Sequence, residues 1–228
     1  MVDSAEVLLL QNVKHSYRQV GKPFPVLENV HLSLKKGEIV ALVSPSGTGK
    51  STILHIAGLL EVPDQGNVII ANQLCNKLSD DKKSFLRCSK IGFVYQEHRL
   101  LMDFSVIENI IFPQIIAGIN HKTAYQRAMD LLSYMDMSQY ANRRSSDISG
   151  GEQQRVAICR AIANKPLIIL ADEPTGNLDL KTAQQVFSIL KYLVVRSGLA
   201  ALIATHNHDL ASQMDRQITI RDGMIADL

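Results

Sequence analysis

Short runs that are apolar at almost every position recur along this 228-residue chain and alternate with segments of helical periodicity. Continuously apolar strands are typical of sheets that are buried on both faces. The alternation therefore predicts an α/β fold with a mostly parallel central sheet. The expected strands are 7–13, 31–34, 38–43, 67–71, 91–95, 167–171, 201–205 and the C-terminal 216–228, and the expected helices are 50–60, 105–117, 122–136, 151–164 and 181–197.

The alternation breaks down in the middle of the chain. Residues 97–165 show helical patterns and no convincing strand, although strand-rich sequence flanks them on both sides. This interruption predicts a helical subdomain inserted into an α/β core made of residues 1–96 and 166–228. The length and a hydrophobic fraction of 46% suit one globular domain.

Composition and charge limit the partners and the compartment that we expect for this chain. The net charge of +2 contains no long Lys/Arg block, so nothing in it requires nucleic acid. Cys75, Cys88 and Cys159 are far apart, which favours free thiols in a reducing compartment, with Cys159 in the core. The N-terminal MVDSAEVLLLQ lacks signal-peptide features, and no apolar run reaches the roughly 18 residues that span a bilayer. We therefore expect a cytosolic chain that meets a membrane only through a partner.

The stretch SPSGTGKST at 44–52 lies between an expected strand and an expected helix. A glycine-rich turn in this position presents backbone N–H groups to an anion, and the helix N-terminus adds a favourable dipole. Gly47 and Gly49 would let the backbone approach phosphates, Lys50 would reach the β- and γ-phosphates, and Ser51 would offer its hydroxyl to Mg²⁺. The pattern G-x-x-x-x-G-K-[ST] is met everywhere except at its first position, which is Ser44.

Two carboxylates follow the apolar run LIILA in the stretch PLIILADEPTGNLD. Ligands of open α/β sheets bind at the C-terminal ends of strands, which is where Asp172 and Glu173 fall. Asp172 suits Mg²⁺, and Glu173 suits a base that polarises an attacking water. The alternative is a pair of solvated carboxylates at a strand end.

A second candidate phosphate site occurs in DISGGEQQRVAICRAIA. Ser149, Gly150 and Gly151 open an amphipathic helix, so free N–H groups point outward from its N-terminus. Ser149 as a simple helix cap is the alternative, but a cap does not explain the two glycines.

Together these motifs resemble, in type and order, the nucleotide-binding subunits of ABC transporters, and the resemblance covers essentially the whole chain. It implies one ATP-binding domain of the P-loop NTPase fold, residues 1–228, with a RecA-like core and antiparallel N-terminal strands. It also implies a head-to-tail homodimer in which the signature residues of one copy complete the ATP site of the other. Those residues are Ser149, Gly150, Gly151 and Glu152.

The resemblance assigns further roles. Tyr17 is similar to the aromatic residue that stacks on adenine, with a surface tyrosine as the alternative. Gln96 would contact Mg²⁺ and the attacking water, Asp179 would cross the dimer interface, and His206 would hold the γ-phosphate and the catalytic Glu173. The implied ATP-binding set is Tyr17, Ser44, Pro45, Ser46, Gly47, Thr48, Gly49, Lys50, Ser51 and Thr52, and the implied Mg²⁺ set is Ser51, Gln96 and Asp172. The histidines without an assigned role are His15, His31, His55, His98, His121 and His208.

Ser44 departs from the family, which has glycine at this position. Serine fits where φ is negative, and costs roughly 1 kcal/mol or more where a left-handed conformation is needed. The groups expected to touch phosphate and metal, Gly47 through Ser51, are intact. We therefore expect Ser44 to be tolerated and the site to bind ATP.

Residues 95–118 narrow the subgroup. The pattern Q-x-x-x-L-L-x-x-F-[ST]-x-x-E-N-[IV] resembles a branch that contains lipoprotein-releasing, macrolide-export and cell-division ATPases. PTGNLD fits that branch, and the tail MDRQITIRDGMI resembles its lipoprotein-releasing members most. Met102 replaces the proline common there, in a region expected to touch the membrane subunits.

This resemblance implies an ATPase at the cytoplasmic face of the bacterial inner membrane, paired with two integral membrane subunits and driving lipoprotein release. The alternatives are the ATPase of an exporter and a cell-division regulator that moves no substrate. A soluble ABC protein acting on ribosomes or DNA would usually need a second cassette or long coiled-coil insertions, for which 228 residues leave no room.

Overall fold

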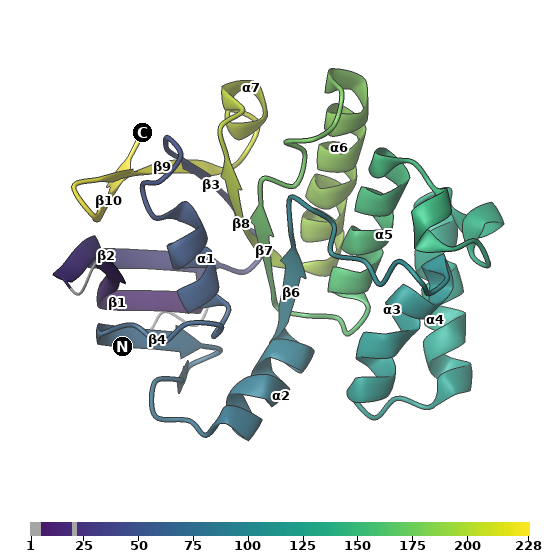
Figure 1. The fold of residues 1–228 in the computed structure, drawn as a ribbon, viewed down its shortest axis with the longest axis horizontal. Coiled ribbons are helices and arrows are strands. Elements are labelled where there is room, and N and C mark those ends of the chain that lie inside the picture. Colours follow the sequence, from purple (N-terminus) through teal and green to yellow (C-terminus); the bar gives the residue numbers. More distant parts are fainter. Residues whose placement is uncertain (1–5, 20–21) are drawn as a thin grey trace.

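The computed structural model describes residues 6–19 and 22–228, so residues 1–5 of the segment without signal-peptide features lie outside it. The strands form two sheets (Figure 1). An antiparallel sheet has the order β2 (Lys22–Lys35), β1 (Glu6–Gln19), β4 (Gln65–Ile70), β5 (Gln73–Leu74). The second sheet has the order β10 (Met224–Asp227), β9 (Arg216–Arg221), β3 (Ile39–Val43), β8 (Ala200–Thr205), β7 (Ile168–Asp172), β6 (Ile91–Val94). Its pairs are parallel except that of β10 with β9, so the predicted parallel sheet is confirmed.

The helices divide between the core and one end of the molecule. They are α1 (Lys50–Ala57), α2 (Asp80–Lys90), α3 (Val106–Ile116), α4 (His121–Tyr134), α5 (Gly150–Ile162), α6 (Leu180–Ser197) and the short α7 (His208–Ala211). Figure 1 shows α3, α4 and α5 gathered at the end of the molecule opposite the antiparallel sheet. Helix α1 shares one hydrophobic core with both sheets.

Strand β3 is apolar at every position because both of its faces are buried. Ile39, Ala41 and Val43 belong to the core that holds α3–α6, whereas Val40 and Leu42 belong to the core around α1. Each face of the strand is therefore covered, and a polar side chain at any of these positions would lose its water without gaining a partner.

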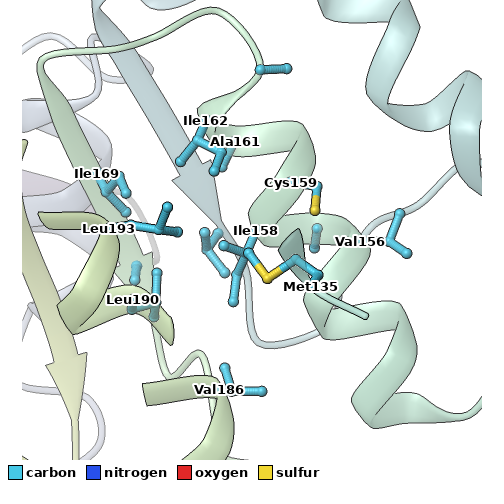
Figure 2. Packing of buried hydrophobic residues seen from close by; sticks show 14 of the residues in the cluster. Met135, Val156, Ile158, Cys159, Ala161, Ile162, Ile169, Val186, Leu190 and Leu193 are labelled. Carbon is cyan, nitrogen blue, oxygen red and sulfur yellow. The ribbon is translucent and has the colours of Figure 1, made fainter. Parts of the chain in front are cut away.

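Helices α5 and α6 cover the parallel sheet on the face opposite α1. Figure 2 shows Ile158, Leu190 and Leu193 directed into the same interior. Cys159 is fully buried in this cluster, and it is a free thiol, as are Cys75 and Cys88. The predictions of free cysteines and of a core position for Cys159 are confirmed.

Residues 97–165 contain α3–α5 and two 3-10 turns, Ser138–Tyr140 and Ser145–Asp147; their only β-type pairing is an isolated bridge between Ser105 and Arg144. The subgroup pattern S-x-x-E-N has a structural role here. Ser105 caps α3, and its backbone N–H donates to Glu108 at 2.7 Å. Buried Asn109 bonds the backbone of Leu101 and the hydroxyl of Ser145, which fastens the loop before α3 to the turn before α5.

Several elements differ from the sequence prediction. The short β5 and α7 were not expected, and the C-terminal run 216–228 forms two antiparallel strands, β9 and β10. Helix α2 was not expected, because among its residues only Leu86 is buried and an apolar stripe is therefore missing. Acidic residues in its first turn and basic residues in its last turn favour the helix instead. Strand β2 begins at Lys22, well before 31–34; it lies at a sheet edge, where Pro23 and Pro25 are allowed in a strand.

Candidate functional site

The loop between β3 and α1 has the shape of an anion cradle. Gly47 and Gly49 have φ values of +82° and +106°. A Cβ at Gly49 would lie 2.8 Å from Cγ1 of Val26, so this position needs glycine both for conformation and for space. The first turn of α1 carries no acidic residue, and Gly49 supplies no side-chain cap. The N-terminal N–H groups of α1 are thus free to meet a phosphate.

Lys50 is nearly buried, and its ammonium group curls back over the loop. Nζ donates to the carbonyl oxygens of Ser44 at 2.6 Å and of Pro45 at 3.1 Å. The carbonyl of Pro45 also accepts the hydroxyl of Thr48 at 2.9 Å. These bonds hold the positive charge within the turn, beside the free N–H groups.

Strand β7 brings a carboxylate to the start of α1. The hydroxyl of Ser51 donates to Oδ2 of Asp172 at 2.8 Å, across a sequence separation of 121 residues. A hydroxyl and a carboxylate in contact are oxygen ligands of the kind that Mg²⁺ prefers.

Glu173 follows directly, in a left-handed conformation with φ of +45°. Its N–H donates to the carbonyl of Ala204 at 2.9 Å, and its carbonyl accepts the N–H of Gly176 at 3.0 Å. Strained backbone at a non-glycine residue costs about 1 kcal/mol or more and persists where surrounding structure enforces it.

The Glu173 carboxylate meets His206, which follows β8. Oε1 lies 3.0 Å from Nδ1 of His206, and Oε2 accepts the backbone N–H of His206 at 3.3 Å. The Glu173 side chain is 12% exposed and that of His206 is 69% exposed. A half-enclosed carboxylate is thus oriented by an imidazole whose far side is open to solvent. Both residues line a second hollow of about 190 Å³ that lies against the first residues of α6.

Gln96 leads out of β6 toward the helical segment. Its Nε2 lies 3.4 Å from Oδ1 of Asn177, a residue without a role in the sequence prediction. Two residues further on, the carbonyl of His98 accepts a hydrogen bond from Arg160 on α5, so this connection is tied to the helix that begins at Gly150.

A cavity of about 410 Å³ collects most of these groups. It is lined by Tyr17, Phe24, Val26, Ser46, Gly47, Gly49, Lys50, Ser51, Thr52, Gln96, Asp172 and Glu173. Phe24 and Val26 were missed by sequence reasoning; Phe24 pairs with Tyr17 across β1 and β2, and only recognition of the long β2 could have placed it there. Tyr17 lies on the same wall and is 41% exposed.

Ser44, Pro45 and Thr48 belong to the loop but not to the cavity wall. Ser44 is buried, and its hydroxyl contacts β9. Its φ is not positive, so the serine carries no left-handed strain, in line with the condition set by the sequence.

The residues of SGGE lie away from this cavity. Ser149 donates its N–H to Glu152 at 2.7 Å in a capping box. A Cβ at Gly151 would lie 2.6 Å from Thr182, so that glycine permits close packing against α6. A Cβ at Gly150 would meet nothing within 4 Å. Asp179 caps α6 and accepts the N–H groups of Lys181 and Thr182, both at 3.1 Å. A hydrogen bond from the Thr182 side chain, followed by these N–H groups, lowers the pKa of the Asp179 carboxyl.

The glycine-rich loop joins a buried strand to a helix, and Lys50, the first residue of that helix, places its ammonium group on the loop. A hydroxyl–carboxylate pair lies beside the loop. This arrangement defines a P-loop NTPase. Residues 27–176 match the family described as "ABC transporter". The chain belongs to this family, and it is an ATP-binding cassette ATPase.

Curated relatives resemble the chain over nearly its whole length. The protein named "Lipoprotein-releasing system ATP-binding protein LolD 1" of Rhodospirillum rubrum is 54% identical, with 96% of each chain covered. The LolD protein of Paramagnetospirillum magneticum is 52% identical, covering 97% of this chain and 98% of its own. A dimeric, post-hydrolysis structure of the ATP-binding cassette MJ0796 bound to ADP and Pi matches with a TM-score of 0.89 at 38% identity, covering 97% and 98% of the two chains.

Among the described residues, no helix combines the length and apolarity needed to cross a membrane.

Proposed function

We propose that this chain is the ATP-hydrolysing subunit of a transporter that releases lipoproteins from the bacterial inner membrane. The observation that carries the proposal is the identity of 52–54% to proteins named for that system, over nearly the full length of both chains. The pattern around Gln96 and the C-terminal tail support the same branch of the family.

The phosphates of ATP would lie in the glycine-rich loop. The N–H groups at the start of α1 and the ammonium of Lys50 would bind them, and exchange of the two carbonyl partners of Lys50 for phosphate oxygens would strengthen the bond. The adenine base of ATP would lie toward Tyr17. The ATP-binding set is the one named from the sequence, with Phe24 and Val26 added from the cavity wall.

Glu173 would accept a proton from the attacking water as catalytic base. Its carboxylate is oriented by His206 at 3.0 Å. His206 would also donate to the γ-phosphate from its exposed side, and Gln96 would position the water. Positioned charge would then stabilise the developing negative charge on the phosphate oxygens.

The residues present fit Mg²⁺. Ser51 and Asp172 offer two oxygen ligands in contact, and Gln96 lines the same cavity. The metal typically binds one or two carboxylates together with substrate phosphates, so a single carboxylate here is sufficient. When bound, Mg²⁺ would supply charge that neutralises the phosphate oxygens.

A second copy of the chain would complete each site. Ser149, Gly150 and Gly151 do not line the cavity of their own chain, and the open space around Gly150 leaves room for a close approach. In the homodimer, these residues and Glu152 would face the ATP of the other copy, and Asp179 would lie at the interface.

The helical segment 97–165 would form a subdomain of the single ATP-binding domain, with 1–96 and 166–228 as its core. Residues 97–110, where Leu101 and Met102 expose apolar side chains, would contact two LolC/LolE-like membrane subunits. The bond of Arg160 to the connection after Gln96 would pass motion between the ATP site and α5. The chain would then lie at the cytoplasmic face of the inner membrane without crossing it and would need no nucleic acid.

The first experiment is co-purification. A tagged Glu173→Gln variant is expressed in its host, membranes are solubilised with ATP present, and bound proteins are identified. Two related membrane subunits with large periplasmic domains are expected. A single such partner would indicate an exporter instead, a division protein would indicate the regulator, and ribosomes or DNA would overturn the transporter assignment.

A further inference from the structure

Three side chains from β1 and α1 contact the carboxylate of Glu61 beside the cavity. The hydroxyl of Tyr17 donates to Oε2 at 2.8 Å, and Nδ1 of His55 lies 3.0 Å from Oε1. Nε2 of His15 is 3.5 Å from Oε2. Glu61 lines none of the cavity wall, and neither the proposed ATP contacts nor the proposed hydrolytic step uses it.

These contacts fix the ring of Tyr17 on several sides. Its hydroxyl also lies 3.1 Å from that of Thr52 on α1. The His15 ring meets the Tyr17 ring edge-on, with centroids 4.9 Å apart and an angle of 89° between the planes. Partial burial raises the pKa of the Tyr17 phenol, with a further increase from Glu61, so the hydroxyl stays a neutral donor. The ring is held in place at the wall of the cavity.

The segment that carries Glu61 is itself anchored at both ends. The N–H groups of Leu60 and Glu61 donate to the carbonyl of His55, at 2.8 and 3.3 Å. Asp64 accepts the N–H of Ser16 at 2.8 Å and donates its own N–H to the carbonyl of Lys14 at 2.9 Å. The carboxylate is therefore fixed relative to α1, which begins at the phosphate loop, and to β1, which carries Tyr17.

We propose that Glu61 is a positioning residue that holds Tyr17 ready for the base of a purine nucleoside triphosphate. This inference rests on the proposed function, in which Tyr17 contacts the base. An aromatic side chain already held in its binding orientation loses less conformational freedom when the ligand arrives. A fixed ring also offers a flat face of constant position, and the larger π-surface of a purine covers it better than that of a pyrimidine. Glu61 thus acts on nucleotide affinity and base preference, apart from the hydrolytic step.

The test compares Glu61→Ala, Tyr17→Phe and the double variant of the full chain. The binding constant of a non-hydrolysable ATP analogue is measured, together with KM and kcat for ATP and for CTP. Glu61→Ala and Tyr17→Phe are each expected to raise KM for ATP about 3- to 10-fold, the range for one newly mobile side chain, with kcat within about twofold. Preference for ATP over CTP falls in both.

The coupling between the two substitutions distinguishes a positioning role of Glu61 from a general contribution to the stability of the fold. If Glu61 acts through the Tyr17 hydroxyl, the double variant is no worse than either single variant. Glu61→Gln, whose amide oxygen can still accept from Tyr17, restores most of the affinity. Asp81→Asn, which removes an exposed carboxylate of α2, is the matched control and leaves KM unchanged. Unfolding in denaturant shows that each variant is folded.

The failures are distinguishable. An unchanged KM in Glu61→Ala, or effects of Glu61→Ala and Tyr17→Phe that add in the double variant, overturns the role of Glu61 alone. An unchanged KM in Tyr17→Ala overturns the base contact of Tyr17 as well. Absence of ATP hydrolysis in the parent chain overturns the proposed function itself.

Discussion

The hydroxyl of Ser44 lies 2.9 Å from the hydroxyl of Thr219 and accepts the backbone N–H of Ile220 at 2.7 Å. A residue at the first position of the phosphate loop is thereby bonded to β9, 176 positions away in the sequence. Glycine, which the family pattern has here, could form neither bond. The departure from the pattern therefore has a structural function in this chain.

Replacement of Ser44 by glycine should cost stability and leave ATP binding nearly unchanged. The buried N–H of Ile220 would lose its acceptor, which typically costs about 1–3 kcal/mol in the free energy of unfolding. Denaturant unfolding and equilibrium binding of ATP check the two halves. Thr219→Val, which removes only the neighbouring hydroxyl, should cost less than Ser44→Gly. Binding of ATP many-fold more tightly by Ser44→Gly would contradict this account and show that serine impairs the site.

Glu173→Gln should keep ATP binding and lose most turnover. The amide is isosteric, so the contact with His206 and the left-handed turn can persist, but the amide cannot accept the proton of the attacking water. A general base contributes typically about 10²–10⁴-fold to the rate, so steady-state ATPase should fall by about that factor. Asp81→Asn, the exposed-carboxylate control, should hydrolyse ATP at the parent rate. Unchanged turnover in Glu173→Gln would assign the base to another residue.

The local parts of the site were predictable from sequence, and its long-range contacts were not. Gly47 and Gly49 have positive φ within the loop, and Lys50 bonds carbonyls of the same loop, so a nine-residue pattern suffices to place them. The left-handed backbone of Glu173 depends on the carbonyl of Ala204, and no propensity favours that conformation for glutamate. Contacts of this kind join residues far apart in sequence.

The side chains near the proposed position of the adenine base divide in the same way, into those that a local pattern predicts and those that depend on long-range contacts. Tyr17 was assigned through the family resemblance, but its partner Glu61 lies 44 positions later in a segment without any pattern. Phe24 was hidden by two flanking prolines, which usually argue against a strand. Helix α2 was missed because Leu86 is its one buried residue, so the apolar period that sequence reasoning relies on is absent.

The three thiols should differ sharply in reactivity. Burial raises the pKa of Cys159 to about 12, so at pH 8 almost none of it is thiolate, and no solvent reaches it. Burial also raises the pKa values of Cys75 and Cys88, but Cys75 is buried whereas Cys88 is partly exposed to solvent. Maleimide labelling of the native chain, read by peptide mass spectrometry, should modify Cys88 first. Labelling of all three should follow only in denaturant; early modification of Cys159 would mean that the α5 core opens readily.

Gly150 offers a test of the dimer that spares the fold. A Cβ there would meet nothing within 4 Å inside its own chain, whereas one at Gly151 would collide with Thr182. Gly150→Leu should therefore leave the unfolding midpoint nearly unchanged but block the close approach of a second copy's ATP. Asp80→Leu, which places the same side chain at the first position of α2, is the matched control.

The measurement is molar mass by light scattering with ATP present, in a Glu173→Gln background that retains the nucleotide. The Glu173→Gln protein and its Asp80→Leu variant should both have a molar mass of twice the 25.3 kDa of one chain. The Gly150→Leu variant should keep the molar mass of one chain. Gly150 is the first residue of α5. The free N–H groups at this helix N-terminus can bind a phosphate only if no Cβ at Gly150 blocks its approach. A Gly150→Leu variant that still dimerises with ATP would place the interface elsewhere on the molecule, and Ser149 and Asp179 would then be simple helix caps.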